Sequence, residues 1–473
     1  MRRGKYLAKN TALFALNVVG TKLIAFLLVP LYTKTFATSE YGMVDLINTI
    51  SVILIPVITL NIGEAVMRFA LDENADKKEI SNIGILFAGL SFLLGFLIIP
   101  IMHFFLRLTV DYHLVYLFCV SQGLYVTFSY NLRGQEKLVQ YAVGNILCTF
   151  MMAVLNILFL VVFKSGIKGF FYSYIISYII STLYCVIKGD VFGHLRHFKI
   201  NSSLAKQMVK YSIVLVPNSF MWWIMNSSDH IMVTSMISIA ANGIYAISYR
   251  IPSILIAFLQ IFNQAWLYSA IHEEESADRT EFHNNMFDKL VRLQLLVTIF
   301  LMLIMKPFLK LYVSAAYYGA WKYTPYLFVG YFFLTMGTFL STSYAVNKDS
   351  KGFLISGTTG AIINITLNAI LIPFIGVHGA ALATCISYIF VFLYRVHDIK
   401  KYIVINVFKR SYVIGYILLM ITAASMFING VIGLIILIIE MILGILLNIG
   451  FIKECVVLAK SLISKVLGRK SNG

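Results

Sequence analysis

Two basic residues of this chain lie inside long apolar stretches, where a charge is costly. Lys22 falls just past the middle of one such stretch. Arg250 begins a helical face along which Gln260 and Gln264 follow. A charged side chain at the centre of a membrane helix costs roughly 2.5–3.5 kcal/mol on insertion scales, so it needs water or a partner. All four side chains are therefore candidates to line a hydrated cavity, and the two basic groups to bind phosphate oxygens there.

Both basic residues also have a structural interpretation. Lys22 could extend its side chain toward the membrane surface or pair with a buried acid. Arg250 could form an ion pair with Asp229, which enters the preceding apolar stretch at similar depth. For each residue the sequence leaves the two interpretations open.

A second polar set lies in the stretch that precedes Arg250. Asn226 and Asp229 share one helical stripe, beside Trp223 and His230. An aromatic surface with hydrogen-bonding groups suits a sugar or a lipid head group. The alternative is an interfacial tryptophan beside a network of hydrogen bonds between helices.

Further ionisable residues are candidates for ion coupling or gating. Glu64 and Arg68 stand at i,i+4 spacing, so a local salt bridge between them is a sufficient explanation. Asp229 and His230 are candidates for the same role. Asp45 is expected to be interfacial, and Glu440 is expected to contact another helix or a lipid-bound group.

The composition indicates that membrane helices position these residues. Of the 473 residues, 59% are hydrophobic and 12% are charged, against about 25% charged residues in an ordinary soluble chain. Apolar runs predict an all-α polytopic membrane protein with about 14 transmembrane helices. The predicted spans are roughly 11–31, 42–69, 80–106, 113–132, 138–163, 167–187, 208–235, 241–270, 285–311, 323–345, 352–374, 378–396, 411–428 and 431–452.

The placement of charge predicts that both ends of the chain lie in the cytoplasm. Apart from Lys22 and Arg250, most of the 38 Lys and Arg residues fall in predicted inside segments. This bias follows the positive-inside rule and accounts for most of the net charge of +17, so the charge is no sign of nucleic-acid binding. The predicted outside segments hold only Lys34, Arg107, Lys164, Lys168, Lys306, Lys310 and Lys322.

An internal repeat predicts how the helices are organised. Its two copies are Leu155-Asn156, Gly166 to Gly169 and Ile176 to Ile179, and then Leu367-Asn368, Gly376 to Gly379 and Ile386 to Ile389. The repeat predicts two parallel six-helix lobes, 1–195 and 196–405, related by a pseudo-twofold axis along the membrane normal. Helices 13 and 14 and a basic tail follow in 406–473.

A weaker echo pairs two other sites in the chain. Tyr41-Gly42, near the start of the second span, matches Asn242-Gly243, near the start of the eighth. The echo supports a repeating unit of six helices.

The sequence shows no pattern typical of catalysis or cofactor binding. We find no phosphate-binding loop, no Ser/His/Asp arrangement and no metal-ligand cluster. The sequence thus predicts a protein that is not an enzyme and has no metal and no cofactor. The five cysteines are scattered through apolar segments and are expected to be small core residues: Cys119, Cys148, Cys185, Cys385 and Cys455.

Several blocks of the chain resemble bacterial polysaccharide-repeat flippases of the Wzx type. This family shares a superfamily with multidrug and cation antiporters of the MATE type. The resemblance covers essentially the whole chain. Its blocks are Lys9-Asn10, Leu28 to Lys34, Glu40 to Gly42, Trp222 to Asp229, Gly243 to Pro252 and Leu367 to Gly379.

The resemblance implies a flippase that moves undecaprenyl-pyrophosphate-linked oligosaccharide repeat units to the outer leaflet by alternating access. It also implies the bacterial cytoplasmic membrane, with polymerase and chain-length proteins as candidate partners. Because no phosphate-binding loop is found, the energy must come from an ion gradient, with H⁺ and Na⁺ as candidate coupling ions, from the membrane potential or from downstream consumption of the product. Lys22 and Arg250 match the cationic cavity residues of the family, and Asp229 matches the acid of its motif. His230 stands where relatives often have Arg, which makes the charge at this position pH-dependent.

Two other functions are weighed against the flippase. A MATE-type antiporter for cations should concentrate acidic groups in its cavity, whereas the deep candidates here include Lys22 and Arg250. A membrane enzyme such as a polymerase or acyltransferase needs large outside loops or catalytic His/Asp sets, and the sequence shows neither.

Overall fold

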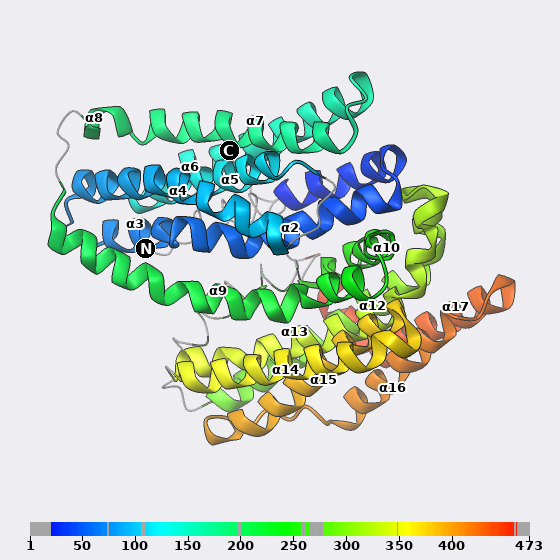
Figure 1. The fold of residues 1–473 in the computed structure, drawn as a ribbon. Coiled ribbons are helices and arrows are strands. Elements are labelled where there is room, and N and C mark those ends of the chain that lie inside the picture. Colours follow the sequence, from blue (N-terminus) through cyan, green and yellow to red (C-terminus); the bar gives the residue numbers. More distant parts are fainter. Residues whose placement is uncertain are drawn as a thin grey trace, which may run out of the picture. The chain divides into compact units, whose positions relative to one another are not determined.

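The computed structural model describes most of the chain as helices (Figure 1). Every regular element in the described residues is helical, so the prediction of an all-α chain is confirmed. The described residues are 20–72, 75–105, 110–195, 200–256, 278–347 and 349–457, with the single positions 259, 262, 263, 266, 270 and 460.

Packing divides the chain into two compact units. Unit 1 comprises Met1–Ala246 and Tyr312–Tyr317, and unit 2 comprises Ile247–Leu311 and Tyr318–Gly473. The two units follow which helices pack together, whereas the predicted lobes follow the sequence repeat, so the lobe boundaries stay a prediction.

Unit 1 begins with a helix over 20–35 and continues to α10. The α9 helix belongs to it because Met208, which is fully buried, joins a core with residues of α3 and α4 such as Ile62 and Ile83. Its other elements are α2 (Thr38–Thr59), α3 (Ile62–Ala70), α4 (Lys77–Phe105), α5 (Tyr112–Gly134), α6 (Leu138–Asn156), η1 (Ile157–Val162), α7 (Gly166–Lys188), α8 (Val191–Leu195), α9 (Ser202–Met236) and α10 (Ile239–Arg250), whose last four residues fall in unit 2.

Unit 2 holds the remaining helices, and α15 packs closely against both α13 and α14. Its elements are α12 (Arg279–Tyr312), η2 (Ala315–Lys322), α13 (Thr324–Val346), α14 (Ser350–Ile375), α15 (Val377–Asp398), η3 (Ile399–Lys401), α16 (Arg410–Ser425) and α17 (Gly430–Leu447). The last residue of α12 and the first three of η2 fall in unit 1.

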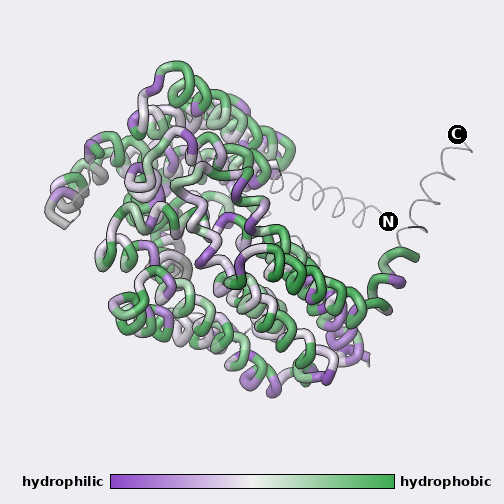
Figure 2. Tube along the Cα trace, turned by 90° about the vertical axis from the view of Figure 1, so that its right-hand side faces the viewer, coloured by the Kyte–Doolittle hydropathy of each residue, from purple (hydrophilic) through white to green (hydrophobic). Residues whose placement is uncertain are grey.

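The helices have the length and composition of membrane spans. In the part of the chain that the structure describes, nine helices are long and apolar enough to cross a membrane. Apolar residues predominate along the helices (Figure 2), and many large apolar side chains are exposed, including Leu27, Val162 and Phe374. Water would not tolerate that surface, but lipid does, so the chain is a polytopic membrane protein. The count of fourteen spans stays a prediction.

Two of the predicted spans are not single continuous helices. The span predicted at 42–69 is broken between α2 and α3, where Leu60 and Asn61 adopt φ of 50° and 53°. Asn tolerates left-handed backbone, but Leu does not do so readily, so surrounding packing must hold Leu60 in this conformation. The span predicted at 241–270 is interrupted after α10, in a turn at Ile251, Pro252 and Ser253.

The sequence repeat corresponds to a helical hairpin in each unit, with a positive-φ glycine where the second helix begins. Gly166 and Gly376, at the matching turn positions, have φ of +56° and +59°. A Cβ atom on Gly379 would lie 2.5 Å from the backbone of Leu371, and one on Gly169 would also meet the facing helix. The repeated glycines are thus required by the turn and by close helix approach.

The structure also shows where the two copies differ in length. In unit 1 the π-helical segment η1 (Ile157–Val162) and a loop at 163–165 separate α6 from Gly166. In unit 2 α14 runs unbroken to Ile375, directly before Gly376. A π-helix has more residues per turn than an α-helix, so η1 and the loop accommodate the two extra residues.

The last two helices are attached to α12 at both of its ends. Lys306 donates to Asn429 Oδ1 at 3.1 Å and lies 4.0 Å from the Trp321 ring. At the other end, Tyr412 donates to Asp288 at 2.6 Å. Between these points Glu440, only 4% exposed, accepts from Ser425 of α16 at 2.6 Å, so this acid contacts another helix.

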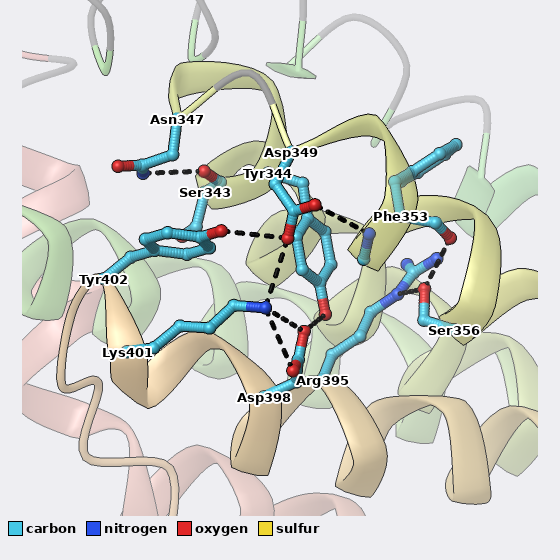
Figure 3. A network of polar contacts seen from close by, with 11 residues as sticks. Ser343, Tyr344, Asn347, Asp349, Phe353, Ser356, Arg395, Asp398, Lys401 and Tyr402 are labelled. Carbon is cyan, nitrogen blue, oxygen red and sulfur yellow. Dashed lines mark hydrogen bonds and ion pairs between the residues drawn. The ribbon is translucent and has the colours of Figure 1, made fainter.

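A network of polar side chains joins the ends of α14 and α15 in unit 2 (Figure 3). Asp349 caps α14 by accepting from the N–H of Gly352 at 2.8 Å, and it also accepts from Tyr402. Lys401 Nζ lies 3.1 Å from both Asp349 and Asp398. The Gly352 N–H, Tyr402 and Lys401 together lower the pKa of the Asp349 carboxyl.

We expect Gly376→Ala to lower the free energy of unfolding by about 1–3 kcal/mol, because Ala at this φ is strained. Gly357→Ala, in α14, which ends directly before Gly376, is the matched control: a Cβ there meets nothing within 4 Å, and we expect no loss. Thermal unfolding of the purified protein in detergent measures both. Equal stability of the two variants would show that the turn does not depend on glycine.

Candidate functional site

A buried polar cluster lies in unit 1 where α2, α9 and α10 meet. It contains Asp45 of α2, Asp229 and His230 of α9, and Asn242 and Tyr245 of α10. Asp229 and His230 are 3% and 8% exposed, and Asn242 and Tyr245 are fully buried. These side chains can remain buried because they satisfy one another.

His230 is the centre of the cluster. Its Nδ1 lies 2.8 Å from Asp45 Oδ2 and 3.0 Å from Asn242 Oδ1. The Asn242 amide nitrogen donates to Asp45 Oδ2 and to the Gly42 carbonyl, both at 3.2 Å, so its oxygen is the group that faces the imidazole. Because both partners of Nδ1 are acceptors, this nitrogen carries a hydrogen.

Asp229 is held on the other side of His230. It accepts from the Tyr245 hydroxyl at 2.8 Å and from the backbone N–H of His230 at 3.0 Å. The rings of His230 and Tyr245 have their centroids 5.1 Å apart. One carboxylate, that of Asp45, thus faces the imidazole directly, and a second, that of Asp229, is bonded to the backbone of the same residue. An imidazole paired with a carboxylate can take up or release a proton.

Two glycines allow the helices to approach closely enough for this cluster. A Cβ atom on Gly42 would lie 1.9 Å from the carbonyl oxygen of Ile239, and one on Gly243 would lie 2.0 Å from that of Thr38. The Tyr41-Gly42 and Asn242-Gly243 echo in the sequence thus marks two segments that pack directly on each other.

Trp223 anchors α9 on α2 at one end of the cluster. Its indole N–H donates to the Thr49 carbonyl at 2.7 Å. The backbone of Asn226 belongs to the described part of α9, but its side chain lies outside what the structure describes. Of the predicted polar stripe, Trp223, Asp229 and His230 are therefore the members whose contacts with α2 or α10 are seen.

Lys22 and Arg250 are both exposed on their helices. Lys22 lies in the helix over 20–35 in unit 1, and Arg250 ends α10 in unit 2. Gln260 and Gln264 lie outside the described residues. An ion pair between Arg250 and Asp229 stays a prediction, as do the roles of all four residues in binding.

The predicted salt bridge between Glu64 and Arg68 is wrong. Arg68 Nη1 instead bonds to Asp72 Oδ1 at 2.6 Å. The physical reason is the break before α3, which leaves a short helix whose last turn, with Arg68, reaches the acid just beyond its end. A gating role for Glu64 and Arg68 stays a prediction.

Sequence reasoning missed the importance of Asp45, Asn242 and Tyr245. The sequence predicts an interfacial Asp45, but its side chain is only 16% exposed and pairs with His230. The glycine echo was the signal that could have found these residues, because it brings Asp45 and Asn242 to the same crossing. Among the described residues, no group of three or more His, Cys, Asp or Glu side chains is placed to hold a metal ion.

Comparison with known proteins places this fold among membrane transporters. A family model described as "Polysaccharide biosynthesis protein" matches residues 7–273. The structure of the lipid II flippase MurJ in an inward closed conformation is similar with a TM-score of 0.68 at 14% identity, over 94% of this chain and all of that one. No curated protein matches the chain significantly.

Structures of MATE transporters share the fold too. An inward-facing multidrug resistance MATE family transporter has a TM-score of 0.65 at 13% identity, over 87% of this chain and 95% of its own. A mutant of the VcmN MATE transporter of Vibrio cholerae has a TM-score of 0.55 at 11% identity, over 85% of this chain and 99% of its own. These likenesses establish the fold.

We expect Asp45→Asn to lower the free energy of unfolding by about 3 kcal/mol, because it removes the charge that faces His230 in a buried pair. The matched control is Asp72→Asn, which breaks the exposed pair with Arg68 and should cost less than about 1 kcal/mol. SDS titration of the purified protein measures both. A loss at Asp45 no larger than that at Asp72 would contradict a central role for the pair.

Proposed function

The chain belongs to the polysaccharide biosynthesis protein family, and from this premise we propose that it is a flippase for lipid-linked oligosaccharides. The substrate is an undecaprenyl-pyrophosphate-linked repeat unit, which moves from the cytoplasmic to the outer leaflet of the bacterial cytoplasmic membrane. The product serves O-antigen, capsule or exopolysaccharide synthesis.

The family match over residues 7–273 is the observation that carries this proposal. It supports a role in polysaccharide biosynthesis for a chain that is itself a polytopic membrane protein. Repeat units assembled in the cytoplasm must cross the bilayer, and unpaired polar and charged groups enter hydrocarbon at high cost. A membrane protein without catalytic machinery fits this step, because the step breaks no covalent bond.

The head group of such a substrate has two chemistries, and the candidate residues suit both. Lys22 and Arg250 are exposed cations, and we assign them to the pyrophosphate. Trp223, Asn226, Gln260 and Gln264 offer an aromatic face and amide groups, which we assign to the sugars. The isoprenoid chain can stay in the bilayer throughout, so only the head group needs a polar path.

We assign ion coupling or gating to Asp229 and His230, with Glu64 and Arg68 as further candidates. The support is the buried cluster, in which the His230 imidazole pairs with Asp45 and the His230 backbone N–H donates to Asp229. H⁺ and Na⁺ are the coupling ions considered, and a polymerase with its chain-length protein is the expected partner on the outer side. Both termini lie in the cytoplasm in this scheme, as the distribution of Lys and Arg predicts.

The alternative function is a MATE-type cation-coupled multidrug antiporter. The shared fold supports it. A site for organic cations needs acidic or aromatic surface, whereas the exposed ionisable residues singled out on the spans, Lys22 and Arg250, are cations. This charge favours an anionic substrate.

Deleting the gene while leaving sugar-unit assembly intact should accumulate lipid-linked repeat units on the cytoplasmic face. The reason is that synthesis continues but the head group cannot cross. Accessibility of the lipid-linked glycan to an added glycosidase or lectin, in right-side-out and inverted membrane vesicles, measures this. Normal appearance of the intermediate on the outer face would refute the flippase.

Lys22→Ala and Arg250→Ala should each reduce surface polysaccharide by at least about tenfold at normal protein levels, since each removes charge-assisted bonds to phosphate. Lys34→Ala and Arg410→Ala remove exposed cations outside the proposed path and serve as controls. Quantitative glycan immunoblots with protein blots measure the effect. Full activity of both test variants would remove Lys22 and Arg250 from the substrate path.

A further inference from the structure

Six residues of the second half of the chain belong to unit 1. Residues Tyr312–Tyr317, which run from the last residue of α12 into η2, are grouped with unit 1, although Leu311 and Tyr318 on either side belong to unit 2. We call this segment the strap. Tyr317 is fully buried and Tyr312 is 8% exposed, so the strap is an integral part of unit 1 and no loose loop on its surface.

The strap contacts the first helix through three side-chain hydroxyls. Tyr312 donates to the Phe26 carbonyl at 2.5 Å, and Ser314 donates to the Thr33 carbonyl at 2.6 Å. Tyr317 donates to the carbonyls of Phe36 and Ala37 at 3.1 and 2.9 Å. All of these acceptors are backbone oxygens in or just after the helix over 20–35.

The sequence of the first helix explains why two of these oxygens need a donor. The carbonyl of Phe26 faces position 30, and Pro30 has no N–H to offer it. The carbonyl of Thr33 would accept from the N–H of Ala37 in a continuing helix. That N–H instead donates to Glu40 Oε2 at 2.9 Å, where it begins α2.

Ring packing adds to these bonds. The Tyr312 ring stacks on Phe26 with centroids 4.6 Å apart, and the Tyr317 ring meets Tyr41 edge to face at 5.8 Å. Tyr41 precedes Gly42, where α2 and α10 are in backbone contact. The strap thus covers the corner between the first helix and α2, beside the buried cluster around His230.

We propose that the strap is a latch that closes the predicted outer end of unit 1 by completing the backbone hydrogen bonds of the first span. The strap is joined at both ends to helices of unit 2, so movement of α12 or η2 pulls directly on its hydroxyls. Release exposes the Phe26 and Thr33 carbonyls to water, which satisfies them in place of the hydroxyls. The latch can therefore open at modest cost on the aqueous side, and it cannot open toward lipid.

The accessibility of Thr33 tests the latch without reference to any substrate. Thr33 is 2% exposed, and Thr33→Cys is a small change that supplies a thiol beneath the strap. Cys455→Ser removes the exposed native cysteine, and the other four cysteines are buried. A membrane-impermeant maleimide added from the outside then reports how often the strap lifts.

In this background we compare a triple variant, which carries Tyr312→Phe, Ser314→Ala and Tyr317→Phe, with Tyr318→Phe alone. Tyr318 is the neighbouring tyrosine outside the strap. The triple variant should raise the labelling rate of the thiol at position 33 by at least about tenfold, since it removes three sets of bonds. Tyr318→Phe should leave the rate unchanged, and equal rates in the two proteins would overturn the latch.

A single substitution serves if the triple variant fails to accumulate. Tyr317→Phe alone removes the bonds to the Phe36 and Ala37 carbonyls and should raise the labelling rate by about threefold. An unchanged rate in this variant would equally overturn the latch.

A reversible cross-link tests whether release is needed for transport. Ser314→Cys with Thr33→Cys, joined by a short bis-thiosulfonate reagent, should stop translocation of the lipid-linked glycan, and a reductant should restore it. Each single-cysteine variant treated with the reagent is the control. Full translocation by the cross-linked protein would overturn the proposal. The cross-linking experiment rests on the proposed function, but failure of that function can be told apart from failure of the latch. If the untreated protein moves no glycan, the flippase assignment fails, while the labelling result still tests the latch.

Discussion

The structure depends on one constraint, which is that a chain in a membrane must satisfy its backbone hydrogen bonds within itself. Continuous helices do this along their length, so the critical places are ends, breaks and prolines. There, side chains from distant parts of the chain complete the bonds. Tyr312 serves the carbonyl opposite Pro30, Ser314 serves that of Thr33 near the end of the first helix, and Lys137 serves that of Lys188, the last residue of α7, at 2.8 Å.

The fold also depends on glycine at particular positions. At Gly42 and Gly243 it permits backbone contact between α2 and α10, and the polar cluster around His230 depends on that contact. At Gly166 and Gly376 it permits a positive φ at the start of the second helix in each copy of the repeat. The repeated blocks are therefore scaffold, and the side chains with chemistry lie in the helices that precede them.

Much of the fold could be predicted from the sequence, because long apolar runs and repeated turn glycines are local signals. Asp229 and His230 could also be recognised, since polar residues in apolar helices stand out. The break at Leu60 and Asn61 could not, because the flanking sequence reads as one apolar run and Leu is not a usual left-handed residue. Asp45 pairs with His230, and the strap bonds to the first helix, across long separations in sequence. Contacts of this kind produce no local sequence pattern from which they could be predicted. The Arg68 contact with Asp72 shows the same limit at short range: two acids stood within reach, and only the geometry of α3 decided between them.

The central claim is that this chain moves an anionic, lipid-linked glycan rather than a cationic drug. The most direct measurement uses the purified protein in liposomes that carry a fluorescent polyprenyl-pyrophosphate oligosaccharide, with its head group accessible to a quencher on one side only. We expect transfer of the glycan across the bilayer at a rate well above that of protein-free liposomes, and no proton- or sodium-driven uptake of an organic cation such as ethidium. Uptake of the cation without movement of the glycan would contradict the claim.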